Sequence, residues 1–195
     1  MTYGYRLNIE DIYLDAADRN WEQAKCEMKD VKELDPATAK VRIFRGPDTD
    51  QGLKSAVQAV VGWAICLEAF ANLAWSQSVA KQMPSSELNK IAMKQLNTPE
   101  KIKEILRNAQ VHLDDKHWLA DIRALFGLRN YLVHYKETIE YIGFAFAPPY
   151  LRYFEENRMK AYRSALRDAV LAIGAVVTVR TDFIHGSFKV VHLEG

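Results

Sequence analysis

The spacing of apolar residues predicts helices along most of the chain. Over residues 8–32 apolar positions recur at helical spacing until Asp35-Pro36 ends the pattern. Residues 40–45 instead alternate between apolar and charged side chains, which is typical of a short extended segment. The first part of the chain is therefore expected to be one long helix followed by an extended stretch.

A second helix is expected to form the buried centre of the fold. Asp48 or Asp50 can cap its start, and the pattern runs to about Met83, just before Pro84. Its middle, residues 55–75, is apolar on nearly every side. A helix with this pattern is usually enclosed by its neighbours.

The rest of the chain predicts further helices and one irregular stretch. The expected helices are a short one capped by Ser85 or Ser86, one opened by Thr98-Pro99-Glu100, one from Asp114 or Asp115 to about residue 138, and one from Tyr150 or Asn157 to about residue 181. Residues 141–147 are expected to be extended or irregular. The predicted fold class is all-α: an antiparallel bundle of four to five long helices, with room for one or two short extended segments.

Length and charge narrow the classes of function. The 195 residues predict a single domain over 1–195, with its core at about 48–181. With 26 basic and 25 acidic residues, the chain lacks the strong positive charge of many nucleic-acid-binding proteins and has no polyacidic tail. Neither a secretory leader nor an uninterrupted membrane span is indicated, which predicts a cytoplasmic protein with no membrane contact. The two cysteines form no metal-binding motif, so neither a metal nor a cofactor is expected.

Three polar residues stand out on the helix expected at 114–138. On a helical wheel with Trp118 at 0°, the apolar residues fall between about −40° and 100°, and Arg129 falls among them at ~20°. A guanidinium cannot lose its proton, so burying it without a partner is very costly. Asn130 and His134 are four residues apart and share one flank of the apolar stripe.

Glu68 is the expected partner of Arg129. It is the only acid within residues 55–75, and Asn72 follows it by one helical turn. A buried bidentate bridge between Glu68 and Arg129 would satisfy both charges and fix the register of the two helices. One interpretation gives this bridge a purely structural role, and the other makes it part of a functional site.

The two motifs together resemble the HEPN superfamily (higher eukaryotes and prokaryotes nucleotide-binding domains). Arg129, Asn130 and His134 fit the signature R-N-x-x-x-H, and Glu68 with Asn72 looks like the E-x-x-x-N helix often found upstream in that superfamily. The resemblance implies a homodimeric, HEPN-like helical bundle. In catalytic members, arginine and histidine from both protomers meet in a cleft and cut RNA without a metal ion.

The resemblance also implies a role for each motif residue. His134 would exchange a proton with the ribose 2′-OH or the 5′-oxygen, Arg129 would stabilise charge on the phosphorane, and Asn130 would orient the imidazole or a phosphate oxygen. Glu68 and Asn72 would support them. The expected function is a metal-independent endoribonuclease of a toxin or defence type, held in check by a cognate antitoxin or regulatory protein.

A non-catalytic function is the alternative. The HEPN toxins that carry H-x-Y would have tyrosine where this chain has Lys136. The alternative is a homodimeric HEPN-like module that binds a partner protein or a nucleotide. Lys160, Arg163 and Arg167 share one face of the last helix, and this face is either an ordinary solvated surface or a stripe that contacts the RNA backbone.

Overall fold

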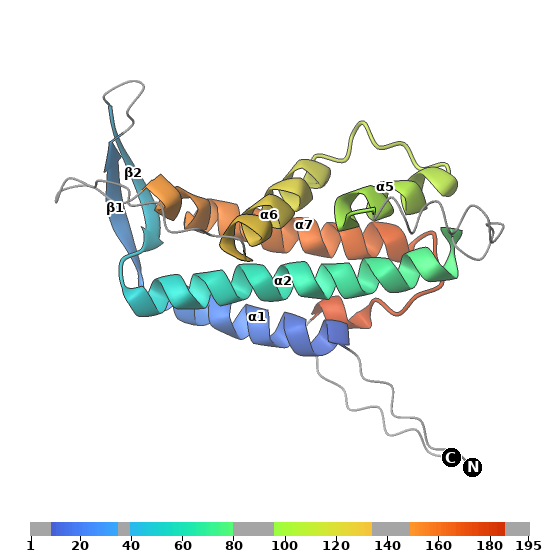
Figure 1. Cartoon of the computed structure of the whole chain (residues 1–195), viewed down its shortest axis with the longest axis horizontal. Coiled ribbons are helices and arrows are strands. Elements are labelled where there is room, and N and C mark those ends of the chain that lie inside the picture. The colour runs from blue at the N-terminus through green and yellow to red at the C-terminus, as the bar shows by residue number, and fades with distance from the viewer. Residues whose placement is uncertain (1–8, 35–39, 80–95, 134–148, 186–195) are drawn as a thin grey trace, which may run out of the picture.

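A computed structural model of the chain describes residues 9–34, 40–79, 96–133 and 149–185. Its α-helices within these ranges are α1 (Ile9–Cys26), α2 (Asp50–Gln77), α5 (Thr98–Asn108), α6 (Trp118–Val133) and α7 (Glu156–Gly174) (Figure 1). Two strands, β1 (Met28–Leu34) and β2 (Val41–Pro47), and two 3-10 helices, η1 (Pro149–Phe154) and η2 (Asp182–His185), complete the described part. The short helix expected after Ser85 or Ser86, the expected helix end at 134–138 and the stretch 141–147 lie outside the described residues.

The all-α prediction is wrong because β1 and β2 form a two-stranded antiparallel sheet. The extended segment expected at 40–45 is confirmed as part of β2, whereas the first helix ends at Cys26 and the chain then continues as β1. In β1 the apolar residues Met28, Val31 and Leu34 are three apart, which resembles helical spacing. Pairing with β2 overrides this local pattern.

Helix α2 is the centre of the fold, as its sequence predicts. Trp63 and Phe70 are fully buried along it, and α1 packs against it closely enough that a Cβ on Gly62 would lie 2.8 Å from the Cβ of Ala17. Trp21 of α1 meets Trp63 edge-on, with ring centroids 6.2 Å apart. The helix is capped by Thr49, whose hydroxyl accepts a hydrogen bond from the Gly52 amide, and not by either of the expected aspartates.

In the view of Figure 1, helices α5, α6 and α7 lie on the opposite side of α2 from α1. Helix α5 begins after Asn97, whose side chain accepts a hydrogen bond from the Glu100 amide, and Pro99 occupies its first turn. Helices α6 and α7 pack on each other and on α2. This arrangement brings α6, which carries Arg129, against α2, which carries Glu68.

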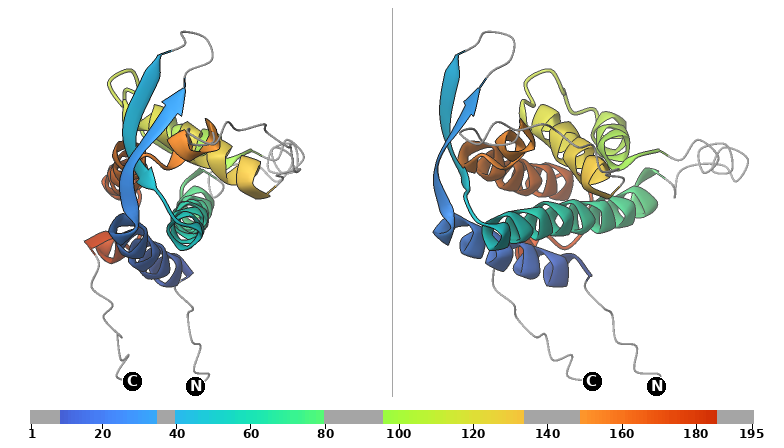
Figure 2. Two further views of the ribbon diagram at one scale, coloured as in Figure 1. Left: turned by 90° about the vertical axis from the view of Figure 1, so that its left-hand side faces the viewer. Right: turned by 60° about the vertical axis from the view of Figure 1, so that its left-hand side comes forward.

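The β1–β2 hairpin stands at the end of the bundle where α1 ends and α2 begins (Figure 2). Val31 and Phe44 pack with Leu151 of η1 in a small cluster of their own. Arg42 pairs with Glu155, and Arg45 Nε lies 3.0 Å from Glu156 Oε2 at the start of α7. The hairpin is thereby attached to the bundle by both apolar and ionic contacts.

Helix α2 is also long and apolar enough to cross a membrane, judged by length and composition alone. In its most apolar window, 56% of the residues are buried inside the fold. The central helix of a soluble bundle has the same character, so this feature is only weak evidence for a span.

Candidate functional site

Arg129 and Glu68 meet where α6 crosses α2. Arg129 Nη2 lies 3.7 Å from Glu68 Oε2, so the expected contact between these two side chains is confirmed. The expectation that the pair is buried is wrong, because the side chains are 29% and 41% exposed, respectively. A partly exposed ion pair of this length contributes no more than about 1 kcal/mol to stability.

Neighbouring side chains orient the guanidinium of Arg129, but they do not use all of its hydrogen-bond donors. Its Nη1 donates a hydrogen bond to Asn130 Oδ1 at 3.0 Å, and its Nη2 is held by the charge of Glu68. Its Nε is buried and has no hydrogen-bond partner among the described residues. A guanidinium offers five donors, so the group keeps N–H bonds available for a further acceptor.

Asn130 and Asn72 are both exposed, but they serve different contacts. Asn130 lies next to Arg129 and accepts its hydrogen bond. Asn72 instead accepts a hydrogen bond from Lys101 Nζ of α5 at 2.7 Å, and so joins α2 to α5. Lys101 was not anticipated from the sequence, because nothing in the local pattern of α5 predicts which residue of α2 it faces.

His134 follows Val133, the last residue of α6, and lies outside the described residues. Its expected place beside Asn130 and its role in proton transfer therefore stay predictions. The described part of the site consists of Glu68, Arg129 and Asn130, which lie at the α2–α6 contact.

The basic face expected on α7 is divided in the structure. Arg163 turns towards α1, where its Nε and Nη2 bind the Asp18 carboxylate at 2.8 and 2.9 Å, and its Nη2 also donates to the Ile184 carbonyl at 3.3 Å. Lys160 Nζ pairs with Glu156 at 2.7 Å, and Arg167 Nη2 pairs with its neighbour Asp168 at 3.1 Å. Lys160 and Arg167 are exposed, whereas Arg163 is a link between helices.

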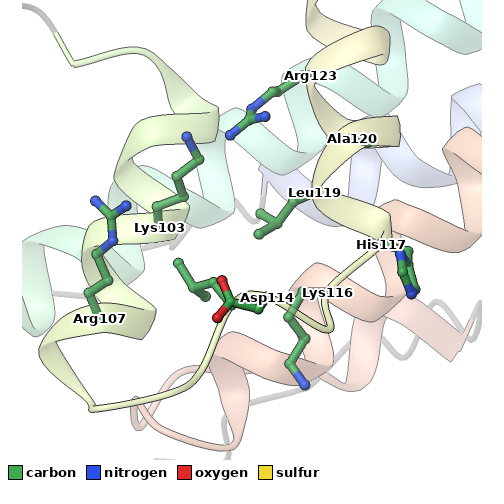
Figure 3. Close-up of a pocket in the computed structure, with 9 residues that line it drawn as sticks. Lys103, Arg107, Asp114, Lys116, His117, Leu119, Ala120 and Arg123 are labelled. Atoms are coloured by element: carbon green, nitrogen blue, oxygen red, sulfur yellow. The ribbon is translucent and has the colours of Figure 1, made fainter.

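The structure reveals a second polar feature that the sequence reasoning missed. A cavity of about 380 Å³ lies between α5 and the start of α6 (Figure 3). Its lining comes from three successive parts of the chain: Lys103, Arg107, Leu113, Asp114, Lys116, His117, Leu119, Ala120 and Arg123. The four-residue spacing of Lys103 and Arg107 was a visible signal, but only the packing of α5 on α6 adds Arg123 to them.

Metal-binding groups and reactive thiols are not prominent in the described part of the chain. Its histidines, cysteines and carboxylates form no cluster of three or more that could hold a metal ion. Cys66 is buried in α2, and this burial raises the pKa of its thiol far above the ordinary value. Cys26 is exposed at the end of α1.

Comparison with known proteins yields no relative: no family model matches the chain, and no curated protein or solved structure matches it either. The HEPN resemblance therefore rests on the sequence motifs around Glu68 and Arg129.

Proposed function

We propose that the protein is a HEPN-like, metal-independent endoribonuclease of a toxin or defence type. The observation that supports this proposal most is the state of Arg129. Its guanidinium is held by Glu68 and Asn130, yet 29% of the side chain is open to solvent. An arginine fixed in this way can bind a phosphate with less loss of conformational entropy than a free surface arginine.

A purely structural role explains the Glu68–Arg129 pair less well. The pair is partly exposed and its closest atoms are 3.7 Å apart, so it contributes little to the free energy of unfolding. The buried Nε of Arg129 lacks a partner among the described residues, which further reduces the stabilising effect. This position suits an arginine whose charge acts on a bound phosphate and does not mainly stabilise the fold.

The proposed reaction needs only the chain's own groups and the RNA. The ribose 2′-oxygen attacks the adjacent phosphorus and loses its proton, the P–O5′ bond breaks, and the 5′-oxygen gains a proton. His134 moves these protons, and Arg129 stabilises the extra negative charge on the phosphorane. The products are a 2′,3′-cyclic phosphate and a 5′-hydroxyl.

A homodimer is part of the proposal. Val133, three residues after Asn130 on α6, is 56% exposed. An apolar side chain one turn from Asn130 is suited to a contact with a second copy, which would bring two Arg129–His134 sets together. The homodimer also belongs to the non-catalytic alternative, so dimerisation alone does not separate the two functions.

The test is RNA cleavage by the purified protein in excess EDTA. The wild type is expected to cleave RNA, and His134→Ala to lose ~10²–10⁴-fold in rate. His185→Ala is the matched control, because His185 is exposed in η2, which packs against α1. A full rate in His134→Ala, or a requirement for a divalent ion, would contradict the proposal.

A further inference from the structure

The cavity between α5 and α6 has the composition of an anion site, and we propose that it binds a phosphate group. Its lining residues include four basic side chains, Lys103, Arg107, Lys116 and Arg123, together with His117. The single acid in the lining is Asp114. Phosphate is the anion that a cluster of lysine and arginine donors recognises best.

Three of the cations come from the two helices that flank the cavity. Lys103 and Arg107 lie one turn apart on α5, and Arg123 comes from α6. In Figure 3 the side chains of Lys103 and Arg123 point towards one another across the opening, with Arg107 further along α5. Lys116 and His117 extend away from this trio in the same view. Lys103 and Arg123 are therefore the groups placed to share one phosphate, and Arg107 adds positive charge nearby.

Two of these three cations already make ion pairs within α5, Lys103 with Glu100 and Arg107 with Glu104. Arg107 Nη1 lies 3.6 Å from Glu104, and both side chains are about half exposed. Arg123 has no ion-pair partner among the described residues. The exposed Arg107–Glu104 pair is weak, so a phosphate that offers several acceptors can replace it or add to it.

Lys103 is the anchor of the proposed site. The residue is only 9% exposed, which is unusual for lysine, and its Nζ donates to Glu100 Oε1 at 2.5 Å. The stem is held by the surrounding core while the charged group reaches the cavity. Binding therefore immobilises little of this side chain, which favours affinity.

A closed turn follows α5 and precedes the part of the lining that begins at Leu113. The Gln110 amide donates to the Arg107 carbonyl and the Val111 amide to the Leu106 carbonyl, both at 2.9 Å. Gln110 has a φ of 59°, the left-handed conformation of a Schellman turn. This closed turn sets the direction of the segment that carries Asp114 and leads into α6.

The face of α6 connects the cavity to the Arg129 site. Arg123 and Asn130 are two helical turns apart on one face, about 10 Å along the axis. Gly127 lies between them, is exposed, and has open space where a Cβ would be. An RNA strand would place one phosphate in the cavity and another at Arg129, and this extension rests on the proposed function. A free nucleotide would occupy the cavity alone.

The experiment measures binding by calorimetry on the full-length His134→Ala chain, so that cleavage plays no part. The probes are pyrophosphate, ATP and a short single-stranded RNA. Arg123→Ala is the test variant, and Arg19→Ala is its control, an exposed helix arginine paired with Asp15 on α1, outside the cavity. We expect Arg123→Ala to weaken pyrophosphate binding by about tenfold or more and Arg19→Ala to leave it unchanged.

Lys103→Gln provides a second test that removes the charge and keeps a polar side chain. It is expected to weaken pyrophosphate binding as strongly as Arg123→Ala, with circular dichroism to confirm that the helices persist. ATP binding tighter than RNA binding assigns the cavity to a free nucleotide, and the reverse assigns it to RNA. No pyrophosphate binding at millimolar concentration, or equal weakening by Arg123→Ala and Arg19→Ala, would overturn the phosphate site. Loss of RNA cleavage alone would not.

Discussion

Arg129 of α6 touches Glu68 of α2 through atoms 3.7 Å apart, and both side chains remain partly open to solvent. The contact joins two packed helices without closing over the charges. Because the pair is partly exposed, it should contribute little to the stability of the fold. Under the proposed function, Arg129 should nevertheless contribute strongly to the binding of a phosphate.

A double-mutant cycle on this pair should give a small coupling energy. Arg129→Met, Glu68→Leu and the double variant are compared by urea denaturation. Because the pair is partly exposed, we expect a coupling of less than about 1 kcal/mol. A coupling of about 3–5 kcal/mol would show that the pair behaves as a buried bridge. RNA cleavage by Arg129→Met should nevertheless be lost.

Asp18 should matter far more for stability than Glu68 does. Its carboxylate accepts hydrogen bonds from Trp63 Nε1 and Arg163 Nε, both at 2.8 Å, and so ties α1 to α2 and α7. Asp18→Ala leaves both donors without this partner and should lower the free energy of unfolding by about 1.5–3 kcal/mol. Asp15→Ala is the control, because its pair with Arg19 is exposed and should contribute less than about 0.5 kcal/mol. Equal losses in the two variants would contradict this role.

The sequence predicts the Glu68–Arg129 contact but not its exposure. One acid and one arginine stand among the apolar residues of two helices, and each charge needs a partner, so the sequence predicts that the two side chains pair. How open the pair is depends on the way α6 crosses α2 and on what covers the contact, which neither helix encodes alone. The Asp18–Arg163 bridge could not be predicted for the same reason, since the position of a cation on one face of a helix does not determine which residue of another helix it contacts.

The error in fold class has a different origin. In β1 the segment from Met28 to Leu34 is rich in charged residues, and one of them, Glu33, is buried near Arg152, with Oε1 and Nη1 4.0 Å apart. In this segment apolar and polar residues do not alternate one by one, so the period-2 pattern that predicts a strand is absent. Pairing with β2 and packing on η1 create the strand.

Gly127→Ala should stabilise the protein. Gly127 is exposed inside α6, and a Cβ there would meet nothing within 4 Å. Alanine reduces the backbone entropy of the unfolded chain, which should add about 0.5–1 kcal/mol to the free energy of unfolding. Thermal or urea denaturation checks this gain, and a loss of stability would contradict the open space found around Gly127. If RNA lies along this face, the same methyl group should weaken RNA binding without weakening pyrophosphate binding.

Glu156 should contribute to the loss of stability in acid. The hydrogen bond from Lys160 holds the pKa of its carboxyl below the ordinary value of 4.5, and Arg45 acts in the same direction. Because the folded-state pKa is the lower one, the stabilisation is complete above the unfolded value and disappears as the pH falls through the folded value. Glu156→Gln should therefore make the free energy of unfolding fall less steeply below about pH 4.5. An unchanged slope would contradict the lowered pKa.

The central claim is tested most directly by the ends of the RNA fragments that the protein produces in excess EDTA. Mass spectrometry of the products should find a 2′,3′-cyclic phosphate on one fragment and a 5′-hydroxyl on the other. A substrate with a single 2′-deoxyribose at the cleavage position should remain intact there, because the attacking oxygen is missing. Fragments with a 3′-hydroxyl and a 5′-phosphate, or cleavage at the deoxyribose, would contradict the mechanism assigned to Arg129 and His134.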